Sequence, residues 1–190
     1  MTQADHSRFL ELLEPVHDKL ARYALVVTKN REDAEDLIND TLLAAFEQFD
    51  KLKEPDKFLH LLLRIASRLW MRRRPRLRRS VELTIEHSDK HTIQPTAEAQ
   101  AELRIAIDAL DTLSPKLKET IVLFDILDLS HEEIRKIQGG TLSGVKSRIR
   151  RGRAELSKKL GVQAQVISSR TAARHEPQAV PYLIPTGYAE

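Results

Sequence analysis

The chain has 190 residues, 41% of them hydrophobic, no cysteine, a formal net charge of +3 and a pI near 9.2. The lack of cysteine excludes disulfides and thiolate catalysis, and no apolar run is long enough to span a membrane. No secretory signal is visible, so we expect a cytoplasmic protein. Few glycines and aromatics, together with long helical periods, indicate an all-α protein.

The first 50 residues contain two segments with helical periodicity. The spacing of the apolar residues in 9–28 predicts one or two core helices, and we expect Pro15 to lie near a helix start or a bend. Residues 32–49 have a complete apolar stripe, and carboxylates share their outer face. These carboxylates are Asp33, Asp36, Asp40 and Glu47. A basic partner surface and a solvated acidic face near a helix N-terminus both fit this pattern.

The next segment changes from apolar to strongly basic. Residues 58–71 are apolar on one side, and residues 64–79 hold eight arginines and no acidic residue, with Pro75 expected to end the helix. Such a run can bind a nucleic-acid backbone. Its candidate contacts are Arg64, Arg68, Arg72, Arg73 and Arg74. Trp70 could stack on an unpaired base, but a core or interface position is the favoured interpretation.

Composition divides the chain into four parts: a helical domain at residues 5–79, a linker at 80–99, a second helical domain at 100–161 and a tail at 162–190. The linker and the tail lack clear periodicity, and we expect the tail to be disordered unless it docks on the body or a partner. The second domain begins with two amphipathic helices, at residues 102–113 and 115–127, the latter opened by Ser114 as N-cap and Pro115.

The sequence pattern of residues 129–160 predicts two short helices joined by a tight turn. Ser130 and Glu133 form a capping box at the first helix. Gly139 and Gly140 can adopt the positive φ angles of a sharp turn, and Thr141 can cap the second helix. The pattern predicts a helix-turn-helix in which the second helix contacts DNA.

The second helix of this motif has an apolar side and a basic side. Long cations reach both phosphates and the acceptor edge of guanine in a major groove. The candidate contacts are Lys146, Ser147, Arg148, Arg150 and Arg151. An amphipathic hairpin with a solvated basic face explains this segment alone equally well.

Two blocks, in this order and spacing, make the chain resemble the extracytoplasmic-function (group 4) sigma factors of the sigma-70 superfamily over residues 8–160. Residues 33–50, DAEDLINDTLLAAFEQFD, resemble the region 2.2 helix that docks on the polymerase β′ clamp. Residues 109–134, ALDTLSPKLKETIVLFDILDLSHEEI, and 143–156, SGVKSRIRRGRAEL, resemble region 4.

The resemblance implies two small helical domains joined by a flexible linker, and partners for each surface. The acidic residues would engage core RNA polymerase at its β′ clamp, region 4 would meet the β flap, and the basic second helix would contact the minus-35 element of promoter DNA. The segment at residues 58–74 would contact and melt the minus-10 element. An anti-sigma partner is also implied, and neither a cofactor nor a metal is expected.

Four residues depart from the family pattern. Arg68 and Arg72 replace small polar residues and predict an unusual minus-10 preference or weak melting. Arg135 replaces an alanine, and Gly140 replaces a buried aliphatic residue in the turn. Since an unpaired buried cation is costly, we expect the head of Arg135 to reach the surface or a phosphate.

The leading hypothesis is therefore a dissociable transcription initiation factor. A sigma-like decoy that binds an anti-sigma factor and an ordinary helix-turn-helix regulator are the alternatives. An enzyme is not expected, because the histidines show no HExxH spacing and no nucleotide-binding glycine loop is present. His60 and His131 are predicted to be structural or exposed.

Overall fold

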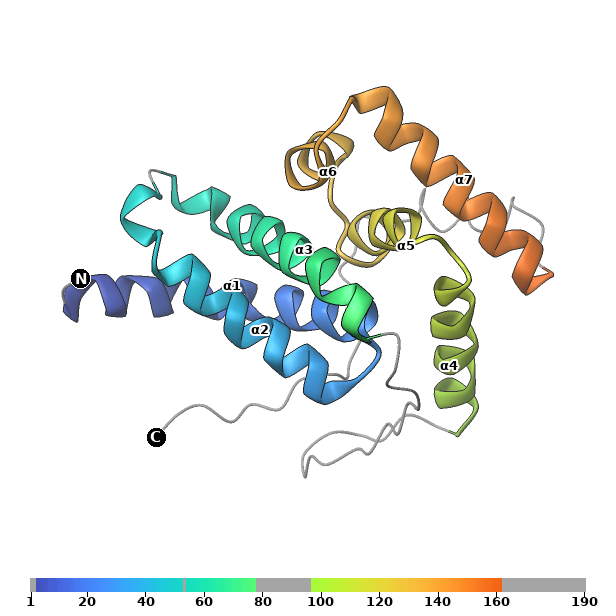
Figure 1. The fold of residues 1–190 in the computed structure, drawn as a ribbon, viewed down its shortest axis with the longest axis horizontal. Coiled ribbons are helices and arrows are strands. Elements are labelled where there is room, and N and C mark those ends of the chain that lie inside the picture. Colours follow the sequence, from blue (N-terminus) through green and yellow to red (C-terminus); the bar gives the residue numbers. More distant parts are fainter. Residues whose placement is uncertain (1–2, 53, 78–96, 162–190) are drawn as a thin grey trace.

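The computed structural model describes residues 3–52, 54–77 and 97–161, and every regular element within these ranges is helical (Figure 1). The predicted all-α class is confirmed. The predicted tail and most of the predicted linker lie outside the described ranges. The backbone at Arg74 is helical, but its side chain is not described.

The N-terminal unit consists of α1 (Gln3–Thr28), α2 (Arg31–Phe46) and α3 (Phe58–Leu77). Helix α1 runs through Pro15, so no helix starts there. Helix α3 continues past Pro75, which was wrongly expected to end it. The ring of proline fixes φ near the helical value, although it removes one backbone donor and crowds the carbonyl four residues earlier.

Aromatic side chains close one end of this unit. The chain passes from α2 to α3 through the short helices η1 (Phe49–Lys51) and η2 (Pro55–Lys57). The ring of Phe9 in α1 meets the rings of Phe49 and Phe58 edge to face, each with 5.2 Å between centroids. These contacts fix the start of α3 against α1.

The C-terminal unit consists of α4 (Ala97–Asp111), α5 (Pro115–Ile121), η3 (Val122–Ile126), α6 (His131–Gln138) and α7 (Leu142–Leu160). Helix α4 begins inside the range predicted as linker. Ser114 is the N-cap residue of α5, as predicted, but its side chain makes no capping hydrogen bond. The π-helix η3 extends α5, and the N–H of Leu127 donates to the carbonyl of Val122 at 3.0 Å.

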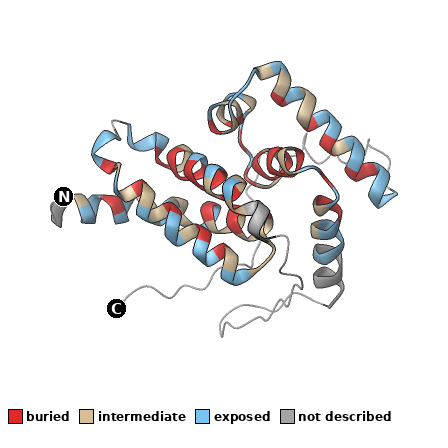
Figure 2. Ribbon diagram, viewed as in Figure 1, coloured by how far each residue is buried: buried red, intermediate tan, exposed pale blue. Residues whose placement is uncertain are grey.

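The two units pack against each other and share one hydrophobic core. Leu123, Ile134 and Val145 of the C-terminal unit belong to the same buried cluster as residues of α1, α2 and α3. Helix α3 lies against α6, and η3 lies against α1. Figure 2 shows α5 and the inner faces of α3 and α6 as almost continuously buried. The sequence predicted two domains, but it did not predict this contact between them.

Candidate nucleic-acid interface

The turn between α6 and α7 has the predicted capping geometry. The hydroxyl of Ser130 accepts from the N–H of Glu133 at 3.3 Å, and the Glu133 carboxylate accepts from the N–H of Ser130 at 2.7 Å. Gly139 and Gly140 have φ angles of 73° and 88°. Thr141 accepts from the N–H of Gly144 at 3.1 Å and starts α7. The predicted capping box, turn and second cap are therefore confirmed.

Helix α7 is held by the face that packs on α5 and α6. Its buried residues include Val145, Ile149 and Leu156. Gly152 also lies on this face, where a Cβ atom would stand only 2.7 Å from Cγ1 of Ile121 in α5. The close approach of the two helices thus depends on glycine at this position, and it directs the opposite face of α7 to solvent.

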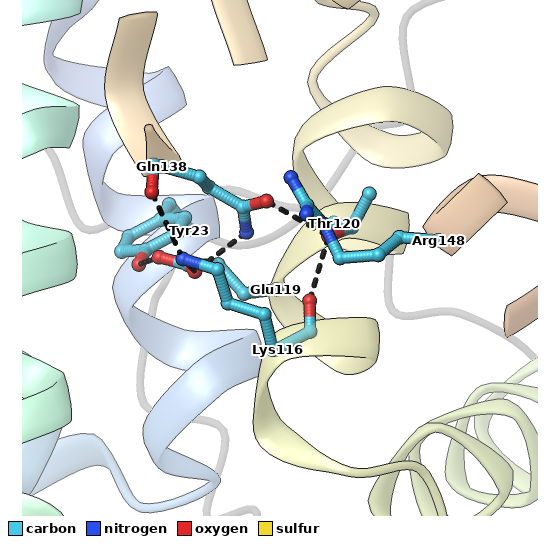
Figure 3. Close-up of polar contacts among 6 residues, drawn as sticks. All are labelled: Tyr23, Lys116, Glu119, Thr120, Gln138 and Arg148. Atoms are coloured by element: carbon cyan, nitrogen blue, oxygen red, sulfur yellow. Dashed lines mark hydrogen bonds and ion pairs between the residues drawn. The ribbon is translucent and has the colours of Figure 1, made fainter. Parts of the chain in front are cut away.

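The structure separates the five candidate contacts on α7 into two groups. Lys146, Arg150 and Arg151 are exposed, and Ser147 is half-buried. Arg148 points toward α5, and its Nε donates to the hydroxyl of Thr120 at 3.3 Å (Figure 3). The periodicity of a basic helix does not predict which cation turns inward, because that depends on the acceptor opposite it.

The environment of Arg148 differs from that of a DNA-contacting cation. Burial lowers the pKa of its guanidinium, the negative charge of Glu119 acts against that shift, and Arg151 adds to it. One terminal nitrogen, Nη2, is buried with no hydrogen-bond partner among the described residues. Arg148 thus serves the α5–α7 contact in this structure.

Three arginines of α3 form an exposed row. Arg64, Arg68 and Arg72 are spaced four residues apart and are all exposed, so they lie on one face. Arg73 is half-buried and forms an ion pair with Asp40 of α2. Two residues predicted to bind different partners therefore contact each other.

Trp70 lies in the core and does not form part of this basic row. Only 4% of it is exposed, and it belongs to the shared hydrophobic cluster. This confirms the favoured interpretation of a core aromatic. Stacking on an unpaired base would have to come from another group, because an interior ring offers no free face.

The outer face of α2 combines acidic residues with one exposed leucine. Asp36, Asp40 and Glu47 are exposed, whereas Asp33 is half-buried in the first turn. Leu43 is 61% exposed and follows Asp36 and Asp40 by seven and three residues, so it lies on the same face. Sequence analysis missed Leu43, although its spacing from the aspartates could have indicated it.

Arg135 in α6 and Gly140 in the turn, which depart from the family pattern, both lie at the surface. The Arg135 side chain is 41% exposed and its Nε donates to Glu132 at 2.8 Å, so the predicted surface position of its head is confirmed. Gly140 is exposed and lies in the turn with positive φ. A buried aliphatic residue is not needed there in this chain.

A polar network around α5 links the two units (Figure 3). The hydroxyl of Tyr23 in α1 donates to Oε1 of Glu119 in α5 at 2.9 Å. The side-chain amide of Gln138 in α6 donates to Oε2 of Glu119 at 2.6 Å and accepts from Thr120 at 2.9 Å. Lys116 adds an ion pair with Glu119 at 3.9 Å. Every oxygen of this buried carboxylate therefore has a partner.

Burial and the neighbouring carboxylate change the acidity of Tyr23. Burial raises the pKa of its hydroxyl well above the ordinary value of 10.0, and the charge and hydrogen bond of Glu119 raise it further. A hydrogen bond with Ser67 acts in the opposite direction. Tyr23 thus stays protonated and remains a donor to Glu119. Sequence analysis missed both residues, since each fits an ordinary helix pattern.

Neither a metal centre nor a membrane-crossing helix is found in the part of the chain that the structure describes. His60 is half-buried and its Nε2 lies 2.9 Å from the Glu133 carboxylate. The ring of His131 packs against Phe124 with 5.0 Å between centroids. Both histidines thus have the structural or surface positions that were predicted.

Two family models match the chain. The model of sigma-70 region 2 matches residues 12–80, and the model of sigma-70 region 4 matches residues 103–156. These ranges contain the acidic helix α2 with the basic row of α3, and the helix-turn-helix, respectively.

Curated relatives carry related names. The ECF RNA polymerase sigma factor SigE of Mycolicibacterium smegmatis is 35% identical over 154 residues, which cover 77% of this chain and 59% of the relative. EcfG of Rhodopseudomonas palustris, also an ECF RNA polymerase sigma factor, is 30% identical, covering 73% of this chain and 77% of the relative. The RNA polymerase sigma-E factor of Streptomyces avermitilis is 24% identical and covers 93% and 97% of the two chains.

Two solved structures are similar over most of the chain. The sigma factor RpoE from Bartonella quintana, in complex with the anti-sigma factor NepR, has a TM-score of 0.67 and 25% identity, covering 82% of this chain and 98% of that one. CnrH in complex with the cytosolic domain of CnrY has a TM-score of 0.62 and 25% identity, covering 82% and 89%.

Proposed function

The chain belongs to the extracytoplasmic-function sigma factors, and from that membership we propose that it binds core RNA polymerase, recognises two promoter elements and supports promoter melting. One observation carries this proposal: an exposed acidic face on α2 and a helix-turn-helix with exposed cations occur in one chain. An ordinary DNA-binding regulator would have no need of the acidic face.

The polymerase would be engaged by the outer face of α2. Asp36 and Asp40 supply negative charge, Glu47 extends it by two turns, and Leu43 supplies an exposed apolar contact among them. A small apolar centre within a charged rim is typical of protein interfaces. We propose that this surface docks on the β′ clamp, with Asp33 contributing mainly at the start of the helix.

The minus-35 element would be read by α7. Lys146, Arg150 and Arg151 are exposed on the face opposite the α5 contact, where they can reach phosphates and base edges. Ser147 lies beside them and supplies a short hydroxyl. Arg148 is omitted from this set because its guanidinium is directed toward Thr120.

The minus-10 element would meet the exposed row of α3. Arg64, Arg68 and Arg72 can follow the backbone of a separated strand by charge attraction. Arg73 can join them only by leaving its ion pair with Asp40. With Trp70 in the core, we propose that melting by this chain depends more on phosphate attraction than on aromatic stacking.

Regulation by an anti-sigma protein is part of the proposal. The similar structures of RpoE and CnrH are complexes with NepR and with the cytosolic domain of CnrY, the former described as an anti-sigma factor. Sigma factors act by binding and the polymerase carries out the chemistry, so we assign no catalytic step, cofactor or metal to this chain. The proposal places the chain in the cytoplasm with the polymerase.

In vitro transcription with purified core RNA polymerase on genomic DNA fragments tests this function. Discrete transcripts, with permanganate-reactive thymines near each start site, are expected when the protein is added. Polymerase binding without melting would favour the sigma-like decoy. Absence of polymerase binding in a pull-down would contradict the proposal.

A further inference from the structure

A cluster of polar side chains holds the helix-turn-helix against α5, and we call it the turn anchor (Figure 3). Its members are Gln138 at the end of α6, Arg148 in α7, and Thr120 in α5, which contacts both of them. We propose that the turn anchor fixes the direction in which α7 presents its exposed cations, and that recognition of the minus-35 sequence depends on it more than attraction to DNA phosphates does. This inference rests on the proposed function, since it names the residues that set the specificity of that same surface.

The turn itself has no side chain that packs against the rest of the described chain. Gly139 and Gly140 are exposed, and a Cβ atom at either position would meet nothing within 4 Å in the part of the chain that the structure describes. Thr141 is also exposed, and its hydroxyl caps α7. Glycine adopts many backbone conformations at little cost, so the two glycines alone do not fix the angle between α6 and α7. Contacts on either side of the turn must fix it.

Gln138 supplies such contacts immediately before the turn. Its side-chain amide donates to Oε2 of Glu119 at 2.6 Å, and its Oε1 accepts from the hydroxyl of Thr120 at 2.9 Å. Its backbone carbonyl accepts from the ammonium of Lys116 at 3.2 Å. Three side chains of α5 thus bind one residue, and that residue directly precedes Gly139.

Arg148 supplies the matching contact after the turn. Its Nε donates to the same Thr120 hydroxyl at 3.3 Å, and the negative charge of Glu119 attracts its guanidinium. Thr120 is fully buried, and its hydroxyl also donates to the backbone carbonyl of Lys116 at 2.6 Å. One hydroxyl of α5 therefore contacts both helices of the DNA-binding motif.

The position of Arg148 in α7 links the turn anchor to the proposed DNA contacts. Lys146 and Arg150 lie two residues before and after Arg148, about 3 Å along the helix axis, and residues two apart point to roughly opposite sides of a helix. Because Arg148 is directed toward α5, Lys146 and Arg150 are directed to solvent, in agreement with their exposure. A rotation of α7 about its own axis would therefore break the turn anchor and redirect both cations.

Hydrogen bonds can fix this rotation, whereas apolar packing restrains it less. Ile137 and Val145 are buried on the inner faces of α6 and α7, but apolar contacts are non-directional. Hydrogen bonds weaken steeply when their angles become unfavourable. Base contacts in the major groove need a fixed geometry, and each good one discriminates against a wrong base by about tenfold, whereas phosphate contacts carry no sequence information. Loss of the turn anchor should thus lower discrimination and leave phosphate attraction in place.

Variants of Thr120 separate the role of its hydroxyl from the role of its shape. Thr120→Val keeps the shape and removes the hydroxyl, so Gln138 and Arg148 both lose a partner, whereas Thr120→Ser keeps the hydroxyl. Thr41→Val is the matched control, because Thr41 is also fully buried and its hydroxyl donates at 2.6 Å to the carbonyl of Leu37, four residues earlier in α2. Both valine variants lose such an intrahelical bond, so a difference between them reports the turn anchor.

Discrimination is measured with holoenzyme assembled from core RNA polymerase and each full-length variant, at a temperature at which all variants are folded. The probes are a duplex promoter fragment found by the transcription assay and the same fragment with its minus-35 bases permuted. The ratio of open complexes on the two fragments should fall about tenfold in Thr120→Val and stay within about twofold of the parent in Thr120→Ser and Thr41→Val. The salt dependence of binding to the permuted fragment should be the same in all variants. An unchanged ratio in Thr120→Val, or an equal fall in Thr120→Ser, would overturn the proposed role.

A second measurement tests the turn anchor without DNA and adds Gln138→Met, which removes its side-chain contacts at a half-buried position. Hydrogen–deuterium exchange of the free chain over residues 138–145 should be faster in Thr120→Val and Gln138→Met than in the parent, Thr120→Ser and Thr41→Val. Because both substitutions remove one shared contact, the double variant should exchange little faster than either single variant. Unchanged exchange would overturn the turn anchor. A parent holoenzyme that forms no open complex on any fragment would instead contradict the proposed function.

Discussion

Gly152 in α7 and Ile121 in α5 approach so closely that a methyl group on the glycine would stand 2.7 Å from Cγ1 and 2.9 Å from Cδ1 of the isoleucine. Gly152→Ala should therefore destabilise the chain. Alanine gains about 1 kcal/mol of helix propensity, but overpacking costs about 1–3 kcal/mol, and we expect a net loss of about 1 kcal/mol. Thermal denaturation of the parent and of Gly152→Ala measures this loss of stability.

A second substitution tests the cause of that loss. Ile121→Val removes Cδ1 and should recover part of the stability of Gly152→Ala, although it lowers the stability of the parent chain. A double-mutant cycle isolates this coupling. Additive effects would show that the clash with Ile121 is not the origin of the loss.

The orientation of Arg148 predicts a contrast among the cations of α7. Arg150→Ala and Lys146→Ala should each weaken DNA binding and reduce the slope of log affinity against log salt by about one unit. Arg148→Ala should leave the slope unchanged and lower the melting temperature, because it removes the bond to Thr120. Fluorescence anisotropy titrations at several salt concentrations measure the slopes. Equal slopes for all three variants would contradict this division.

Substitution of Leu43 tests the proposed polymerase-binding face of α2. Leu43→Ala should weaken binding to core RNA polymerase about tenfold, because an exposed leucine among acidic residues is a natural anchor at an interface. Leu10→Ala is the matched control, since Leu10 in α1 is 49% exposed and lies on another helix. Asp36→Lys should also weaken binding. A pull-down in which both leucine variants behave alike would count against the α2 surface.

The carboxylate of Glu133 should make the stability of the folded chain depend on pH. Burial raises the pKa of Glu133, but hydrogen bonds from Ser130 and His60 lower it by more. The pKa of Glu133 therefore lies below its ordinary value of 4.5. A lowered pKa means that the carboxylate stabilises the folded chain above its unfolded pKa, and that this contribution is lost as the pH falls through the folded-state value. The difference in melting temperature between the parent and Glu133→Gln should therefore narrow below about pH 4.5. A difference that stays constant with pH would contradict this assignment.

Local features of the fold were predictable because their causes lie within a few residues. The capping box of Ser130 and Glu133, the glycine turn and the acidic face of α2 all follow from short-range spacing. The contact of Tyr23 with Glu119 was not predictable, since the two residues are 96 positions apart and each fits its own helix. The inward orientation of Arg148 was not predictable for the same reason, because the hydroxyl to which it donates lies 28 residues away in α5.

The interior position of Trp70 has a practical consequence. It is the one tryptophan in the chain, and it belongs to the hydrophobic cluster that both units share. Its fluorescence should be blue-shifted in the native protein and should move to longer wavelength on denaturation, while DNA that binds α7 leaves it largely unquenched. The protein therefore carries an intrinsic optical probe of core integrity that is separate from the exposed cations proposed to bind DNA.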